Sequence, residues 1–408
     1  MSTLRPFPGC RWRETEIRRN GSILSQAPAP GTFRILASSA SARTGEFGTD
    51  HGTIRTPAFM PVGTAGSVKS LTSEEVAGTG ADVILGNTYH LWLRPGTAFL
   101  RERGGLRRFN RWTGALLTDS GGFQAWSLSK IRKIDDEGIT FASHLDGSRL
   151  RFTPESVLEA QRDIGADIAM ALDECTPSDA DFATAERSWN RTLSWTRTMA
   201  DLWRRDPTAH GHGQFLFPIV QGALHDGLRE RSAREAAELD LPGNAIGGLS
   251  VGEPEADMYR IAALCCGILP ASKPRYVMGV GTPRNLLELV DRGVDMFDCV
   301  MPTRNARNGM VFTWNGPFHY KAASVAADER PIDPGCGCEA CRAGYSRAYL
   351  RHLFKAGEIL PLRLASLHNI HFYQELMDAS RRSILEGTWP DFRDATLARL
   401  RGTGEPSP

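Results

Sequence analysis

The chain has 408 residues, of which 41% are hydrophobic and 23% charged, and its formal net charge is +1. These are ordinary globular values, and the charge neither implies nor excludes a nucleic-acid partner. No run of eighteen apolar residues occurs, which excludes a membrane-spanning helix, and the length suits one barrel domain with additions. Because the start lacks an apolar core of secretory length, we expect a cytoplasmic protein whose eight cysteines form no disulfide framework.

Residues 1–32 end in an Ala/Pro stretch, and we expect them to form a disordered leader. Beyond them, short apolar runs alternate with longer amphipathic segments, as in a parallel sheet that helices cover. The eight runs are Ala58–Thr64, Asp82–Asn87, Ala115–Ser120, Asp167–Glu174, Phe215–Gly222, Asn244–Ser250, Arg275–Gly281 and Asp295–Pro302. Eight such units favour a (β/α)8 TIM barrel over residues 33–302, with a doubly wound sheet as the alternative.

Two of the segments between the apolar runs carry signals for both ends of a helix. Residues 153–165 begin with Thr-Pro and end with Gly, which predicts an N-cap, a first helical residue and a helix end. Residues 282–293 repeat this order. Both segments are therefore predicted to be helices that follow barrel strands.

Polar residues stand toward the carboxyl ends of five of the runs: Asn87, Asp119, Asp173, Gln221 and Asp298. Gly248 and Gly279 leave bare backbone at two further ends. In a parallel barrel all these ends open onto one face, where the active sites of barrel enzymes lie. One acid at such a position is more often a helix cap or a turn residue, but five polar ends together predict a site.

After the last run, three cysteines crowd into six positions: Cys336, Cys338 and Cys341. Thiolates at this spacing predict a zinc site that needs a fourth ligand. His352, His368 and His371 lie downstream, and the last two are three apart on one helical face, so spacing alone does not choose between them. With four protein ligands the Zn2+ would be structural. We expect residues 303–390 to form a zinc-binding subdomain with closing helices, and 391–408 a tail.

Seven segments, taken in this order, resemble the bacterial tRNA-guanine transglycosylases, also called queuine tRNA-ribosyltransferases. They are "LTDSGGFQ", "LDECTP", "IVQG", "AIGGLSVGE", "YVMGVGTP", "DMFDCVMPTRNARNG" and "CGCEAC…LHN". The similarity runs from about residue 33 to 387. It implies a zinc-containing (β/α)8 barrel, usually a homodimer. Such an enzyme exchanges the wobble guanine of certain tRNA anticodons for preQ1 (7-aminomethyl-7-deazaguanine) through a covalent aspartyl-ribose intermediate.

The resemblance also implies residue roles, with Asp298 as the nucleophile and Asp119 as the acid/base residue. Base recognition and packing would fall to Asp173, Gln221, Gly248, Leu249, Met278 and Phe123, the last at a position that is Tyr in some members. Arg304 and Arg307 would contact nucleotides beside the exchanged one. The zinc ligands would be Cys336, Cys338, Cys341 and His368. Because the two catalytic aspartates end the third and the last predicted strands, only a closed barrel would bring them together.

Two alternatives remain at this point. The chain could be a zinc-containing RNA-binding protein on an inert barrel, or the non-catalytic subunit of a transglycosylase-like complex. The presence of both Asp119 and Asp298 argues against the second. Between residues 301 and 355, eight Lys/Arg stand against four Asp/Glu, which favours a tRNA-binding surface beside the last strand.

Overall fold

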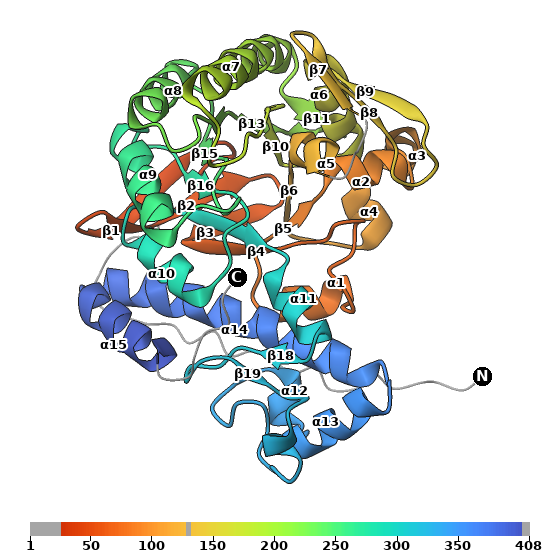
Figure 1. Ribbon diagram of the computed structural model, residues 1–408, viewed down its shortest axis with the longest axis vertical. Coiled ribbons are helices and arrows are strands. Elements are labelled where there is room, and N and C mark those ends of the chain that lie inside the picture. Colours follow the sequence, from red (N-terminus) through yellow and green to blue (C-terminus); the bar gives the residue numbers. More distant parts are fainter. Residues whose placement is uncertain (1–25, 128–131, 402–408) are drawn as a thin grey trace.

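A computed structural model describes residues 26–127 and 132–401, so most of the predicted leader lies outside the described residues. Its centre is a parallel β-barrel of eight strand positions (Figure 1). These are β4 (Ala58–Pro61), β5 (Val83–Gly86), β6 (Ala115–Thr118), β10 (Ile168–Met170), β13 (Phe215–Phe217) continued by β14 (Ile219–Val220), β15 (Asn244–Ile246), β16 (Arg275–Val277) and β17 (Met296–Cys299). Each lies in one of the predicted apolar runs.

The ring closes at two seams. Its strands form two sheets of orders β13-β10-β6-β5 and β14-β15-β16-β17-β4. Pro218, which has no N–H to give to a neighbour, separates β13 from β14 within one run of chain. At the other seam Val62 forms a parallel bridge with Leu85. The closed ring confirms the barrel and rules out the doubly wound sheet.

Helices cover the outside of the barrel. Those before β13 are α1 (Ser73–Gly78), α2 (Thr88–Leu93), α3 (Thr97–Glu102), α4 (Leu106–Asn110), α5 (Gly122–Ser127), α6 (Pro154–Ile164) and α7 (Phe182–Arg205). Those between β14 and β17 are α8 (Asp226–Glu238), α9 (Glu255–Ile268) and α10 (Pro283–Val290). Both helices predicted from end signals are present: Thr153 caps α6, Thr282 caps α10, and Gly165 ends α6 at φ 79°.

A three-stranded antiparallel sheet, which was not predicted from the sequence, closes the amino-terminal end of the barrel. It consists of β1 (Phe33–Ser39), β2 (Ala42–Thr49) and β3 (Gly52–Thr56). Its Phe47 and Ile54 pack into the apolar interior of the barrel. Three aspartates directly before barrel strands hold it through the pairs Arg43–Asp295, His51–Asp167 and Arg55–Asp82. We call this sheet the basal sheet.

Smaller sheets are inserted between barrel units. The β7 (Arg132–Asp135), β8 (Gly138–Ala142) and β9 (Arg149–Phe152) sheet follows α5, and β11 (Thr208–Ala209) pairs with β12 (His212–Gly213). After β17 come α11 (Met301–Arg307), β18 (Met310–Val311), β19 (Phe318–His319), the 3-10 helix η1 (Ala323–Val325), α12 (Glu339–Arg342), α13 (Arg347–Lys355), α14 (Leu360–Leu385) and α15 (Trp389–Arg401).

The long helix α14 joins this C-terminal part to the barrel (Figure 1). Gln374 donates to the carbonyl of Phe59 in β4 (3.0 Å), and Asn369 donates to the carbonyl of Pro302 in α11 (2.9 Å).

The predicted tail from residue 391 contains most of α15, whose Leu397 is buried. Within the described residues, no helix combines the length and apolarity that crossing a membrane requires.

Candidate active site and metal cluster

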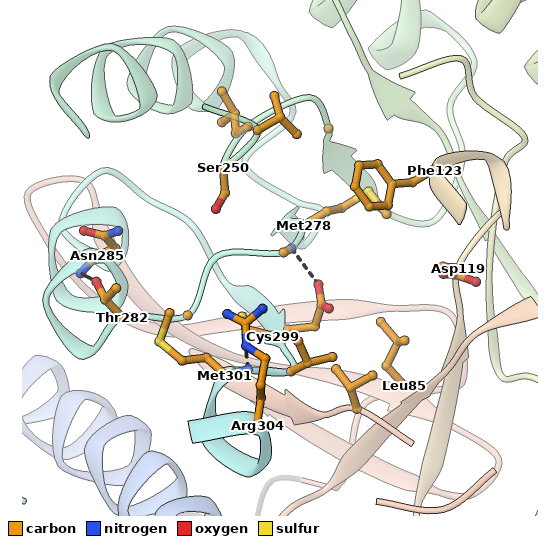
Figure 2. Close-up of a pocket in the computed structure, with 18 of the residues that line it drawn as sticks. Leu85, Asp119, Phe123, Ser250, Met278, Thr282, Asn285, Cys299, Met301 and Arg304 are labelled. Atoms are coloured by element: carbon orange, nitrogen blue, oxygen red, sulfur yellow. Dashed lines mark hydrogen bonds between the residues drawn. The ribbon is translucent and has the colours of Figure 1, made fainter. Parts of the chain in front are cut away.

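One cavity of about 930 Å³ opens where the barrel strands end. The sequence-predicted residues that line it are Asn87, Asp119, Phe123, Asp173, Gln221, Gly248, Leu249, Met278, Gly279, Asp298 and Arg304. Arg307 is not among the lining residues. In Figure 2, Phe123 of α5, Met278 after β16 and Arg304 of α11 point into the pocket. The barrel therefore brings the two aspartates of the third and last strands to one cavity, while the roles of these residues stay predictions.

Asp298 is the next-to-last residue of β17, and only one of its carboxylate oxygens is held. Oδ1 accepts hydrogen bonds from the hydroxyl of Tyr276 (2.6 Å) and the backbone N–H of Gly279 (2.8 Å). In the described part of the chain no hydrogen bond reaches Oδ2. The residue is half-buried in the cavity wall, and burial raises the pKa of its carboxyl group.

Asp119 has both oxygens occupied by neutral donors. Oδ2 accepts from the side-chain amides of Asn87 (2.6 Å) and Gln124 (2.8 Å), and Oδ1 accepts from the backbone N–H of Thr88 (2.7 Å). The side chain is buried, and burial raises its pKa to about 6 despite these hydrogen bonds. A carboxyl group in this range can both hold and release a proton near neutral pH.

Asp173 and Gln221 form a buried polar pair beside these acids. Asp173 accepts from the hydroxyl of Ser120 (2.7 Å) and from the amide nitrogen of Gln221 (2.7 Å), and burial raises its pKa. The Oε1 atom of Gln221 is buried and has no hydrogen-bond partner among the described residues. Gly248 has φ 63°, and a Cβ there would lie 2.6 Å from this oxygen, so only glycine permits the close approach.

A buried arginine shapes the wall on this side. Arg229 of α8 is fully buried, and its guanidinium donates only to main-chain carbonyls among the described residues. The acceptors are Val220 (3.1 Å), Ala223 (2.8 Å), Gly247 (2.8 Å) and Gly248 (3.3 Å). These bonds tie the ends of β14 and β15 together and fix the backbone that lines the cavity.

Sequence reasoning missed three of these supporting residues. Tyr276 is the polar member of an apolar strand and stands two residues before Met278, on the same face, so strand alternation could have indicated it. Gln124 lies in the quoted "LTDSGGFQ" segment, but nothing there shows that it reaches Asp119. Nothing in the sequence singles out Arg229, because its acceptors are backbone carbonyls.

Outside the barrel mouth, Cys336, Cys338, Cys341 and His368 are all buried, and one donor atom of each lies within 4.8 Å of the others. His368 Nδ1 is 3.6 Å from the sulfur of Cys338 and 3.4 Å from that of Cys341. The other ring nitrogen, Nε2, lies 2.7 Å from the carbonyl oxygen of Phe312, so it carries the hydrogen and leaves the Nδ1 lone pair facing the thiols. This cluster could hold a metal ion, and its NS3 donor set fits zinc.

The other two histidine candidates lie elsewhere. His371 lies beside the cluster and contacts Glu375 at 3.1 Å, so it groups with Cys336 and Glu375. His352 is exposed on α13 and belongs to none of the ligand groups found among the described residues. The structure thus places His368 with the three cysteines, a choice that spacing alone left open.

A closed barrel with acids gathered at its mouth, joined to a buried Cys3His cluster that could hold a metal ion, is the architecture of a (β/α)8 enzyme. Comparison with known proteins gives the particular family. The chain belongs to the queuine tRNA-ribosyltransferase family of pentosyltransferases, whose model matches residues 38–401. This confirms the resemblance inferred from the motifs.

Relatives with the name queuine tRNA-ribosyltransferase match nearly their whole lengths. The protein of Solidesulfovibrio magneticus is 50% identical over 377 residues, covering 92% of this chain and 100% of the relative. That of Pelotomaculum thermopropionicum is 51% identical over 372 residues, covering 91% and 98%. That of Francisella tularensis subsp. novicida is 47% identical over 369 residues, covering 90% and 99%.

Proposed function

We propose that this protein exchanges the wobble guanine of queuosine-type tRNAs for preQ1, by a double displacement through a covalent aspartyl-ribose intermediate. Membership of the queuine tRNA-ribosyltransferase family supports ribosyl transfer on tRNA as part of queuosine biosynthesis. The observation that carries the proposal is the convergence of Asp298 and Asp119 on one cavity, with one oxygen of Asp298 unengaged by the described residues.

Asp298 is suited to attack C1′ of the ribose. Tyr276 and Gly279 hold Oδ1, which orients the carboxylate and leaves Oδ2 to form a C1′–O bond. As that bond forms, the C1′–N9 bond breaks and its electron pair passes to the departing guanine. The N9 of preQ1 then displaces the carboxylate and restores Asp298. Two displacements retain the configuration at C1′.

Asp119 is suited to move protons rather than to attack. Its oxygens are occupied by three neutral donors, and its pKa of about 6 allows the residue to exist in either protonation state near neutral pH. It can give a proton to the departing base and accept one from the incoming base. The different hydrogen-bond environments of the two aspartates therefore support different roles.

The remaining pocket residues match the groups that guanine presents. The N1–H and N2–H2 edge consists of donors, which suits the Asp173 carboxylate, whereas O6 is an acceptor, which suits the Gln221 amide and a backbone N–H near Gly248. A mismatched base would leave buried groups unpaired, at about 1–3 kcal/mol each. Phe123 and Met278 can pack on the ring, and an anticodon loop can present a base out of its stack.

The metal cluster supports this site indirectly. Cys336, Cys338, Cys341 and His368 would hold Zn2+, which supplies a structural cross-link when bound. The cross-link would join α12 to α14, and α14 packs on α11, which carries Arg304 and Arg307. Arg304 is exposed and lines the cavity, so it is placed for a phosphate of the RNA, and Arg307 lies one helical turn on. The formation of a homodimer, which the family resemblance implies, stays a prediction.

The test is incorporation of labelled guanine into an anticodon stem-loop RNA, with trapping of a covalent RNA–protein adduct on denaturing gels. The wild type should do both, and Asp298→Asn should lose both while it still binds the RNA. Asp201→Asn, at an exposed position on α7, is the matched control and should behave as the wild type. Exchange at the wild-type rate by Asp298→Asn would contradict the mechanism, and RNA binding without exchange by the wild type would favour an RNA-binding protein.

A further inference from the structure

Two histidines and an aspartate lie close together at the other end of the barrel. The proposed exchange does not use them. One nitrogen each of His51 and His212 and one carboxylate oxygen of Asp167 lie within 4.8 Å of one another. They come from the turn between β2 and β3, from strand β12 and from the residue directly before β10. The cluster therefore lies where the basal sheet meets the barrel.

Asp167 gives the cluster a fixed centre. The side chain is fully buried, and Oδ2 accepts from the backbone N–H of Leu116 (2.8 Å). Its own backbone N–H donates to the carbonyl of Leu116 (2.8 Å), and its carbonyl accepts from Phe215 (2.7 Å). These bonds leave Oδ1 directed at His51, whose Nδ1 lies 2.5 Å away.

His212 is anchored in the manner of a metal ligand. Nδ1 of His212 lies 3.0 Å from the carbonyl oxygen of Gly213, which makes it the donor and leaves the Nε2 lone pair available. The rings of His51 and His212 meet edge to face with centroids 4.5 Å apart. Both residues are half-buried, so an ion can reach them from solvent. Histidine ligands usually hold their second nitrogen on a carbonyl or a carboxylate, as His212 does on Gly213.

We infer that His51, Asp167 and His212 form a second metal site, for a divalent transition-metal ion such as Zn2+ or Co2+. Two imidazoles and one carboxylate are a donor set that such ions favour. Ligand bonds of about 2.0–2.2 Å place the donor atoms roughly 3–3.5 Å apart. On metal binding the distance between His51 Nδ1 and Asp167 Oδ1 would therefore lengthen, and the longer distances between donor atoms of the cluster would shorten. A bound ion would link the basal sheet to the barrel.

The charge of the Arg107 guanidinium acts on both Asp167 and His212. That charge repels a cation bound to the cluster. Asp50, which precedes His51 in the chain, accepts from the backbone N–H of Gly213 (2.6 Å). Removal of the Arg107 charge should therefore tighten metal binding.

The test is equilibrium dialysis of the full-length protein, already carrying one equivalent of zinc, against Co2+. We expect a further equivalent of Co2+ whose visible spectrum has weak d–d bands without intense thiolate-to-metal charge transfer, because no sulfur binds it. His212→Ala and His51→Gln should each weaken this binding at least about 100-fold, and Arg107→Gln should strengthen it several-fold. His319→Ala, at an exposed histidine on β19, is the control.

Absence of a further equivalent in the wild type would overturn the proposal, as would undiminished binding by both histidine variants. The two variants change different elements, so one remains informative where the other fails to fold. Guanine exchange by His212→Ala should stay at the wild-type rate, so the outcome is independent of the proposed function.

Discussion

Tyr276→Phe removes one of the two hydrogen bonds that hold Asp298 and leaves the ring that fills the barrel. The phenol is buried, and its hydroxyl donates to Asp298 Oδ1 at 2.6 Å, while the Gly279 N–H still donates to the same oxygen. In the wild type this hydrogen bond stabilises the ionised carboxylate, and it therefore lowers the pKa of Asp298, whereas burial raises it. The variant should therefore have a more basic Asp298.

The size of the change follows from the chemistry of this bond. A hydrogen bond to a charged group contributes about 1.5–3 kcal/mol, and one pKa unit corresponds to about 1.4 kcal/mol. The pKa of Asp298 should rise by about one to two units. In the proposed mechanism Asp298 attacks C1′ as the ionised carboxylate, so the acid limb of the kcat/KM profile should move up by the same amount. At pH values below the acid limb, kcat/KM of the variant should be about 10- to 100-fold lower than that of the wild type.

The assay is labelled-guanine incorporation measured across pH, with unfolding followed in parallel. Tyr320→Phe is the matched control, because it deletes another buried hydroxyl, one that donates to the Ala306 carbonyl (2.9 Å) and does not line the cavity. Its profile should keep the wild-type shape. A Tyr276→Phe rate that falls equally at every pH, with the acid limb unmoved, would refute the assignment of this bond to the charge of Asp298.

Two further predictions concern Asp119 and the metal ligands. Burial raises the pKa of Asp119 from 3.8 to about 6, so its proton stabilises the folded state fully below about pH 4, and this contribution is lost as pH rises through 6. The urea-unfolding free energy of the wild type relative to Asp119→Asn should fall by about 1–2 kcal/mol from about pH 5 to pH 8, and a pH-independent difference would contradict this. His368→Ala should lose the zinc of the Cys cluster in elemental analysis, and His371→Ala should keep it; the reverse pattern would make His371 the fourth ligand.

The barrel was predictable because its signals are local. A strand buried on both faces reads as a continuous apolar run, and all eight runs contain barrel strands. Thr-Pro and Gly marked the ends of α6 because caps depend on the backbone of a few neighbouring residues. The polar ends of the runs then predicted residues that line the cavity, since strand direction alone sends those ends to one face.

The partners of these residues were not predictable, because they depend on closure. Tyr276 can donate to Asp298 only because β16 and β17 are paired. Gln124 reaches Asp119 because of the turn that leads into α5. The basal sheet was missed because its contacts join residues far apart, such as Arg43 and Asp295. His368 and His371 share a helical face, so only the fold of residues 333–341 against α14 could separate them.

The aspartates at the two ends of the barrel differ in their partners, and this difference supports the proposed chemistry. At the amino-terminal ends, Asp82, Asp167 and Asp295 each pair with an arginine or a histidine of the basal sheet. At the mouth, Asp119, Asp173 and Asp298 accept only from neutral donors, and no ion pair to them occurs among the described residues. Three acids that form no ion pair make their part of the cavity electronegative wherever they are ionised. Positive charge that develops on a ribose during base exchange would be stabilised there. The absence of ion pairs to these acids would therefore stabilise the transition state of base exchange rather than the folded protein.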